Sequence, residues 1–337
     1  MEYPELSIPS PGKWTEITDG LLWLRMPLPF DLDHINLYLI EDNDGWVVID
    51  TGLASSTTKD LWTAIFSALD KPICGVIVTH LHPDHVGLAG WIAEEFKVPL
   101  YMSQLEYFTA RALSEKAPGR SNWRDEEYFK RAGLATEQID VLLSGNKGFG
   151  SVVSPLPLSY TRLKQNDVLS FKGREWRVMI GKGHSPEHVC LHCQELGVLL
   201  AGDHILPMIT PNIGVYTTEP EGNTLQDYLA TLVPFTELPS DTLILPAHKQ
   251  PFIGVQARVD ELISHHHRHL AALNEACEQP RSLVSLLPIM FKRELNGRNI
   301  MFAVAECLSH LNYLRFSNKL IRTLSDSGVY LYQSRHR

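Results

Sequence analysis

Three histidines and one aspartate crowd into the short segment THLHPDH at residues 79–85. The side chains that could do chemistry there are His80, His82, Asp84 and His85. The apolar run CGVIV at residues 74–78 directly precedes this segment and predicts a buried strand. Open α/β sheets place their ligand sites in loops at the C-terminal ends of strands. Since imidazole and carboxylate groups suit zinc, iron or manganese, the segment predicts a metal site.

Other predicted strands also deliver a metal-compatible side chain at their C-terminal ends. These strands, with the residue that follows each, are 46–49 with Asp50, 176–180 with His184, 198–200 with Asp203, and 242–244 with His248. A single placement of this kind is weak evidence, because polar residues are common in loops. Five placements in the same sense favour one shared site, built from side chains that lie far apart in the sequence.

Four further histidines lie in a predicted long helix over residues 255–276 and invite the same interpretation. They are His265, His266, His267 and His269. Successive residues of an α-helix point about 100° apart, so three consecutive histidines cannot converge on one ion. We therefore predict that these side chains form a solvated face of the helix.

The five cysteines are odd in number and scattered through the chain, which does not fit a disulfide framework. Cys190 and Cys193 form a CLHC sequence that is similar to a redox or zinc motif. This sequence lies in a predicted strand, where neighbouring side chains alternate between faces. Because no second cysteine pair exists to complete a four-thiolate site, we interpret both cysteines as structural thiols.

The composition is that of a soluble globular protein with a large core. The chain has 337 residues, of which 44% are hydrophobic and 20% charged, and these are ordinary proportions for such a protein. No apolar run approaches the ~18 residues that span a bilayer. The acidic, proline-broken start MEYPE also differs from a secretory signal. We therefore expect a cytoplasmic protein that has no membrane partner.

Charge is unevenly distributed along the chain. The net charge of −9 disfavours nonspecific nucleic-acid binding by the chain as a whole. From Arg281 onward, however, nine Lys or Arg residues stand against three acidic residues, so this tail carries +6 and the remainder −15. Two interpretations stay open. The tail holds an anionic partner or substrate group, or a basic module simply docks on an acidic body.

The order of predicted elements indicates an α/β protein with an inserted helical segment. Strands are expected between residues 14 and 49 and again between 168 and 246, with the helical segment over about 103–148. This segment either caps the metal loop or forms a helical hairpin packed elsewhere, and we favour the cap. Its apolar side chains include Leu105, Phe108, Tyr128, Phe129 and Leu142.

The end of the chain predicts a small separate module. Two apolar helices are expected over 283–291 and 300–314, followed by a hairpin around the turn DSG at 326–328. Helices followed by a two-stranded wing are typical of a winged-helix-like α+β module. We therefore predict two domains, one over residues 1–278 and one over 279–337.

The HxHxDH motif at residues 80–85, with His184, Asp203 and His248 after it, resembles the metallo-β-lactamase superfamily. Asp50 occupies the upstream motif position of that superfamily, and the similarity covers about residues 15–275. The winged-helix-like tail resembles the β-lactamase-like protein 2 branch, which includes thioesterases and an endoribonuclease. The resemblance implies an αββα sandwich with the metals at one edge of the paired sheets.

The resemblance also implies a role for each motif residue. The ligand sets that it implies are His80, His82 and His184 for one divalent ion, and Asp84, His85 and His248 for a second. Asp203 would bridge both ions, and Asp50 would accept a hydrogen bond that orients a ligand. Zinc is the expected metal, with iron or manganese as alternatives. Glu187, His188 and His204 lie beside the motifs and either face the substrate or only pack.

Two divalent ions about 3.5–4 Å apart can share one water and one carboxylate. They lower the pKa of the water from about 15.7 toward ~7, so a hydroxide can attack an electrophilic carbonyl or phosphorus. An ion would stabilise the oxyanion, and the second ion or a water on Asp84 would assist the leaving group. The sequence shows no Gly-x-Ser-x-Gly motif and no phosphate-binding glycine loop. We therefore predict a dinuclear hydrolase that acts on a small ester, thioester such as an acyl-coenzyme A, or lactone.

Alternative functions stay open. Phosphodiester hydrolysis of RNA is favoured by the basic tail, but the acidic body lacks a basic run near residues 80–85. A non-enzymatic winged-helix binding protein would need only a closed structural metal site, whereas seven candidate ligands suit an open catalytic one. Redox chemistry with iron ranks last, because no flavin or second redox domain is visible. The substrate and the oligomeric state, a homodimer included, stay undetermined.

Overall fold

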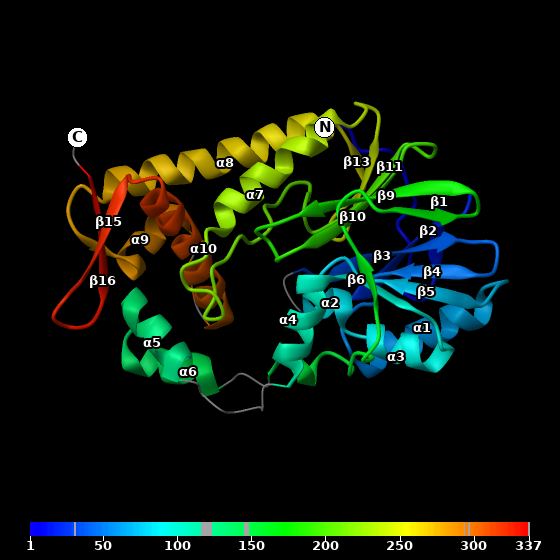
Figure 1. Ribbon diagram of the computed structural model, residues 1–337, viewed down its shortest axis with the longest axis horizontal. Coiled ribbons are helices and arrows are strands. Elements are labelled where there is room, and N and C mark those ends of the chain that lie inside the picture. The colour runs from blue at the N-terminus through cyan, green and yellow to red at the C-terminus, as the bar shows by residue number, and fades with distance from the viewer. Residues whose placement is uncertain (30–31, 116–122, 145–147, 293, 296, 336–337) are drawn as a thin grey trace. The chain divides into compact units, whose positions relative to one another are not determined.

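The computed structural model describes residues 1–29, 32–115, 123–144, 148–292, 294–295 and 297–335 (Figure 1). The chain forms two compact units. The first contains residues 1–116, 148–211 and 234–258, and the second contains residues 117–147, 212–233 and 259–337. Among the described residues, no helix has the length and apolar character that a membrane crossing requires.

The first unit contains a seven-stranded sheet in which the strands follow one another in sequence order (Figure 1). The strands are Trp14–Thr18 (β1), Leu21–Pro27 (β2), His34–Glu41 (β3), Trp46–Ile49 (β4), Ile73–Ile77 (β5), Leu100–Ser103 (β6) and Thr161–Leu163 (β7). β1 to β4 pair antiparallel, whereas β4 to β7 pair parallel. Because β4 and β5 are parallel, the segments that follow them leave the sheet at the same edge.

The first unit also contains a six-stranded sheet in the order β13-β12-β11-β10-β9-β8. The strands are Val168–Phe171 (β8), Arg174–Gly181 (β9), His188–Cys193 (β10), Val198–Gly202 (β11), Leu243–Pro246 (β12) and Phe252–Ile253 (β13). β10 pairs antiparallel with both β9 and β11, and β11 pairs parallel with β12. β9, β11 and β12 therefore run in the same direction and end at the same edge.

The two sheets pack face to face through alternate apolar side chains, as the period of two along a strand requires. Trp23 and Tyr38 of the first sheet and Val178 and Leu191 of the second belong to one buried cluster. The predicted α/β class is confirmed.

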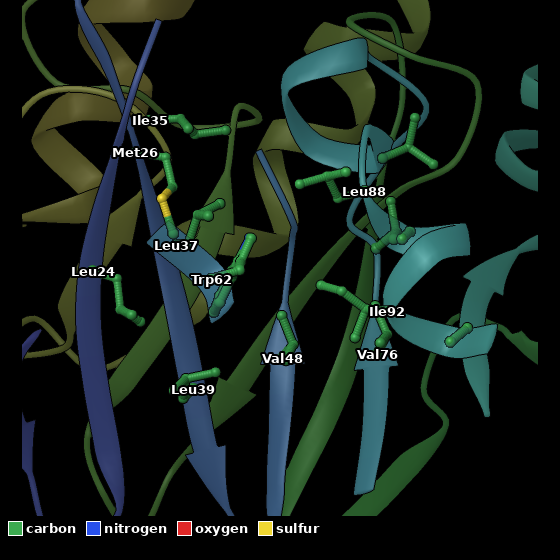
Figure 2. Packing of buried hydrophobic residues seen from close by; sticks show 14 of the residues in the cluster. Leu24, Met26, Ile35, Leu37, Leu39, Val48, Trp62, Val76, Leu88 and Ile92 are labelled. Carbon is green, nitrogen blue, oxygen red and sulfur yellow. The ribbon is translucent and has the colours of Figure 1, made fainter. Parts of the chain in front are cut away.

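Helices cover the other face of the seven-stranded sheet. α1 (Ser56–Ala68) and α3 (Ala89–Phe96) lie against it, and Figure 2 shows Trp62 of α1 and Ile92 of α3 among the strand side chains. α1 buries one stripe because its apolar residues recur at helical spacing. Full burial of each large apolar side chain contributes about 1.5–3 kcal/mol. This core stabilises the seven-stranded sheet, from whose edge the loops after β4 and β5 leave.

The second unit is mostly helical and ends in a small sheet. Its helices are Trp123–Ala132 (α5), Thr136–Ser144 (α6), Thr224–Leu232 (α7), Leu283–Met290 (α9) and Gly297–Phe316 (α10), together with most of α8 (Val255–Ala276). Its three strands are Arg281–Ser282 (β14), Leu320–Leu324 (β15) and Tyr330–Ser334 (β16), in the order β14-β16-β15. The hairpin of β15 and β16 confirms the strands predicted there. The winged-helix interpretation and the boundary at residue 279 stay predictions.

The helical segment predicted over 103–148 is divided between the two units. α4 (Gln104–Ser114) belongs to the first unit, whereas α5 and α6 belong to the second. The predicted break at Ala117-Pro118-Gly119 lies outside the described residues. The cap over the metal loop therefore stays a prediction.

The predicted solvated histidine face of α8 is wrong. His266 is fully buried, and its Nδ1 lies 3.1 Å from Nε2 of His310 in α10. Among the four histidines of the helix, His267 alone is exposed. His266 continues the buried stripe Val259, Leu262, Leu270 and Leu273. Steps of three and four residues place it on the apolar side, where helical periodicity requires burial.

The two cysteines of the CLHC sequence lie in β10 and occupy different environments. Cys193 belongs to the cluster between the sheets, whereas Sγ of Cys190 lies 3.5 Å from the carbonyl oxygen of Ala201. Both are free and buried. Burial raises the pKa of both thiols, which disfavours the reactive thiolate form.

Candidate metal centre

Five strand ends of the first unit bring their polar residues together. Asp50 follows β4, the motif 80–85 follows β5, and His184, Asp203 and His248 follow β9, β11 and β12. In each case the strand ends at the sheet edge and the next residues turn into a loop. Pro83 begins the short helix α2 (Pro83–Val86), where its fixed φ suits the first helical position.

Two groups of metal-compatible side chains result. One contains His80, His82, His184 and Asp203, and the other contains Asp84, His85 and His248. Within each group, one ligand atom per residue lies within 4.8 Å of every other. Nε2 of His80 lies 2.9 Å from Nδ1 of His82 and 3.3 Å from Nε2 of His184. Ligand atoms of one tetrahedral zinc ion lie about 3.3 Å apart, so this spacing suits a common ion.

Asp203 reaches the imidazoles of both groups. Its Oδ2 lies 3.4 Å from Nε2 of His184 and 3.5 Å from Nε2 of His85. Its Oδ1 lies 3.5 Å from Nε2 of His248. A single carboxylate in this position can be shared by two cations.

The donor set fits divalent cations. Nε2 of His85 and Oδ1 of Asp203 are buried and make no hydrogen bond with the residues that the structure describes. A buried polar atom left unpaired costs about 1–3 kcal/mol. Each of these atoms carries a lone pair, so a cation would satisfy both. Nitrogen and carboxylate oxygen donors together suit Zn²⁺, iron or manganese.

Asp50 holds the ring of His85. Oδ2 of Asp50 accepts a hydrogen bond from Nδ1 of His85 at 2.7 Å and another from the hydroxyl of Thr79 at 2.7 Å. Oδ1 accepts the backbone N–H of Thr79, also at 2.7 Å. Once a cation replaces the proton on Nε2, His85 keeps its proton on Nδ1 and presents the Nε2 lone pair to the centre. Sequence reasoning named Asp50 but missed Thr79, which an ordinary threonine at a strand end does not reveal.

A backbone carbonyl orients the ring of His248, which lies in the turn after β12. Its Nδ1 donates to the carbonyl oxygen of His34 at 3.0 Å, which leaves Nε2 free to act as a donor to an ion. The buried amide of Asn36 donates to the carbonyls of Pro246 and Lys249, both at 2.9 Å. Asn36 lies in the apolar strand β3 and carries no motif, so the sequence did not single it out.

Carboxylates and imidazoles shift one another's pKa at this centre. Burial opposes protonation of His85, but the carboxylates of Asp50 and Asp203 raise its pKa well above the usual value. Burial, together with the neighbouring His184, lowers the pKa of His82 to about 3. Burial alone would raise the pKa of Asp203, but His248 and His85 hold it well below its usual range. An ionised Asp203 and a neutral His82 are the forms that coordinate a cation.

Comparison with known protein families gives a match over the part of the chain that carries these residues. Residues 30–248 match the family described as the metallo-beta-lactamase superfamily. The chain belongs to this superfamily. Residues 270–335 match a second family, described as the metallo-beta-lactamase-like C-terminal domain.

Relatives of this superfamily member include proteins with hydrolase names. The chain is 23% identical over 341 residues to the probable metallo-hydrolase YqjP of Bacillus subtilis, which covers 93% of this chain and 98% of that protein. It is 24% identical over 256 residues to the acyl-coenzyme A thioesterase MBLAC2 of Homo sapiens, covering 69% of this chain and 80% of that protein. A beta-lactamase-like protein 2 homolog of Caenorhabditis elegans is 23% identical over 265 residues, 77% of this chain and 71% of that protein.

Solved structures of the superfamily share the fold along almost the whole chain. A beta-lactamase domain protein from Burkholderia ambifaria is 39% identical with a TM-score of 0.92, covering 99% of this chain and 98% of that one. A metallo-beta-lactamase family protein from Thermus thermophilus is 27% identical with a TM-score of 0.80, covering 95% and 100%. The superfamily fold implied by the sequence motifs is therefore confirmed.

His188 and His204 lie behind the superfamily centre and are fully buried. Nε2 of His188 accepts the backbone N–H of Asp203 at 3.0 Å, so this ring supports the backbone of the shared carboxylate. Glycines make room for both rings. A Cβ at Gly202 would lie 2.5 Å from the ring of His188, and a Cβ at Gly181 would lie 2.3 Å from that of His204. Both rings are thus packed within the protein in this structure.

Glu187 also serves a structural contact in this superfamily member. Its Oε2 accepts the backbone N–H of Leu105 at the start of α4, at 3.0 Å. The carbonyl oxygen of Glu187 accepts the hydroxyl of Ser103 at 2.7 Å. The turn that carries His184 is thereby attached to α4.

Proposed function

We propose that this chain is a divalent-metal-dependent hydrolase of a small thioester or ester, with lactones as related substrates. The observation that carries the proposal is the pair of donor groups that share Asp203. The proposed ligands are His80, His82 and His184 for one ion and Asp84, His85 and His248 for the other. Zinc is the proposed metal.

Two ions at such a centre would supply hydroxide at neutral pH and polarise the substrate carbonyl. The chain's own groups fix the geometry. Asp203 is held between the groups from both sides, and Asp50 and the carbonyl of His34 orient the imidazoles of His85 and His248. These two imidazoles cannot transfer a proton to the substrate, because Nδ1 of each is hydrogen-bonded to Asp50 or to His34 and Nε2 of each would bind an ion.

Asp84 is the proposed group for proton transfer to the leaving group. Its Oδ2 lies 3.4 Å from Nε2 of His248, and its side chain is 20% exposed, whereas that of His248 is 2% exposed. Burial opposes ionisation, but the imidazoles of His85 and His248 lower the pKa of Asp84. Its carboxylate is therefore ionised at neutral pH and reaches solvent, so it can accept a proton that the leaving group later takes up.

A thioester substrate is supported by the names of relatives. Relatives named acyl-coenzyme A thioesterase match 69% of this chain at 24% identity. No serine or cysteine nucleophile is needed, because attack on an activated carbonyl is within the reach of a two-ion centre. The net charge of −9 disfavours RNA as the substrate.

A substrate screen with a matched pair of variants tests this proposal. We expect the zinc-loaded protein to hydrolyse acyl-coenzyme A or p-nitrophenyl esters, with activity removed by chelation and restored by Zn²⁺. Asp203→Asn should lower kcat/KM by at least about 100-fold, since loss of a group that only orients a ligand already costs about 10- to 100-fold. Asp60→Asn, the same change at an exposed position of α1, should retain wild-type activity.

Lactones and single-stranded RNA complete the screen. Cleavage of RNA without thioester or ester turnover would contradict the substrate class but keep the ion pair. Wild-type activity in Asp203→Asn would contradict the metal centre itself.

A further inference from the structure

Glu106 is a buried carboxylate that belongs to neither donor group. It lies in the first turn of α4 and is fully buried. Its Oε2 accepts the backbone N–H of Leu81 at 2.8 Å, and its Oε1 accepts the backbone N–H of Glu187 at 2.7 Å. Burying a carboxylate is costly unless it is hydrogen-bonded, and here each oxygen has a donor of its own.

The two donors belong to different ligand loops. Leu81 lies between His80 and His82, in the loop that follows β5 of the seven-stranded sheet. Glu187 lies three residues after His184, in the turn between β9 and β10 of the six-stranded sheet. No ladder of strand hydrogen bonds joins these sheets in the part of the chain that the structure describes. Their separation is set by packing, by side chains that reach both, and by single backbone bonds such as that from the N–H of Val189 to the carbonyl of Thr79 at 2.8 Å.

Further bonds keep Glu106 in place. Two residues at the start of α4 donate to the His184 turn, at 2.7 and 3.0 Å: the N-cap Ser103 through its hydroxyl and Leu105 through its backbone N–H. Glu187 accepts both. The start of α4 and the His184 turn are therefore joined by hydrogen bonds in both directions. The carboxylate of Glu106 also binds the loop of His80 and His82.

We propose that Glu106 is a positioning residue that sets the distance between the two ligand loops, so that His80, His82 and His184 converge on one ion. The inference rests on the proposed metal-dependent function. Two backbone N–H groups donate short hydrogen bonds to one planar carboxylate, which fixes their separation. An amide at this position cannot do the same, because one of its two terminal atoms is a donor that would face an N–H.

Metal affinity of the full chain tests this role. In Glu106→Gln, which preserves side-chain size, we expect Zn²⁺ affinity to fall about 10- to 100-fold in competition with a chelator, as for other residues that orient ligands. The visible absorption of the Co²⁺-loaded protein should also change at saturating Co²⁺, because the ligand geometry changes. The matched control is Glu94→Gln, the same substitution at an exposed position of α3, and it should bind Zn²⁺ as the wild type does.

The melting temperature of the metal-free protein separates positioning from general stability, because loss of a positioning residue lowers metal affinity by more than any fall in this temperature explains. Wild-type Zn²⁺ affinity and an unaltered Co²⁺ spectrum in Glu106→Gln would overturn the inference, whatever its melting temperature. If the Gln variant does not fold, Glu106→Asp takes its place, since its carboxylate is one methylene short of spanning both N–H groups. A wild-type protein that binds neither Zn²⁺ nor Co²⁺ would instead overturn the proposed function.

Discussion

At the scale of single residues, the position of Asp203 depends on the ring of His188 and on the space that Gly202 leaves for it. The ring fills the volume above Gly202 and accepts the backbone N–H of Asp203. Gly202 has a φ of 50°, in the region that favours glycine. Both the backbone and the ring therefore require a residue without a Cβ at this point.

We predict that Gly202→Ala destabilises the protein and weakens metal binding. The added methyl group would meet the ring of His188 at 2.5 Å, and overpacking of this kind costs about 1–3 kcal/mol beyond the backbone strain. Urea denaturation and Zn²⁺ titration measure the two effects.

Gly197→Ala is the matched control, because Gly197 has a φ of 61° but no atom within 4 Å of a Cβ. It carries the backbone strain without the clash. Equal losses of stability in the two variants would show that His188 yields easily and does not support Asp203.

Sequence alone indicated the residues that could hold metal and Asp50 as one that orients a ligand, but not the other residues that hold them in place. His80, His82 and His85 stand out because similar chemistry recurs within one short loop after an apolar run. Glu106 and Asn36 act through long-range hydrogen bonds to backbone atoms. A single polar residue in a helix or strand has no spacing pattern, so its partners become visible only when the chain is folded.

At the scale of elements, the apolar periodicity of α8 already placed His266 on the buried side, but the run of three histidines was given more weight. The run of three histidines suggested a solvated face, yet His266 is in step with the apolar residues on either side of it. Burial of the imidazole lowers the pKa of His266 to about 2, and that of His310 to about 3. This pair should make the second unit sensitive to acid.

We predict that the second unit loses stability as the pH falls below about 6.5. The unfolded chain binds a proton at His266 near pH 6.5, whereas the folded chain does not, so the stabilisation is fully present above that pH and is lost below it. The loss for His266 should reach about 2–3 kcal/mol at pH 4.5. Urea denaturation from pH 7.5 to 4.5, followed by amide exchange in α8 and α10, measures it.

The neighbouring exposed histidine offers the comparison for this experiment. His266→Gln should flatten the dependence of the unfolding free energy on pH, and His267→Gln should leave it as in the wild type. An identical pH slope in all three proteins would mean that His266 takes up its proton equally in the folded and unfolded states.

At the scale of the whole molecule, the chain passes between its two units several times. Residues 117–147 and 212–233 join the second unit, although they lie between segments of the first. Tyr128 donates to the carbonyl of Val215 at 2.7 Å, and Arg131 donates to that of Gly328 at 2.8 Å. Local periodicity predicted the helices and strands themselves, but contacts between distant segments decide which unit each one joins.

All the proposed ligands belong to the first unit, so we predict that chelation destabilises that unit selectively. Free Zn²⁺ at 100 times its Kd would contribute about 2.7 kcal/mol to the folded state. Amide exchange measured with and without EDTA should accelerate in residues 79–88 and 183–188, while exchange in α10 stays unchanged. Acceleration of similar size in α10 would contradict the selectivity.

The proposed ligands come from both sheets, and His248 enters long after His80 in the sequence. During synthesis, the early strands can pair while the later half of the coordination sphere has not yet left the ribosome. Contacts of such large sequence separation form late, because loop-closure entropy opposes them until most of the chain has condensed. Cation capture should therefore be one of the last events in the maturation of the nascent protein, and truncation before β12 should yield a chain that cannot retain its metals.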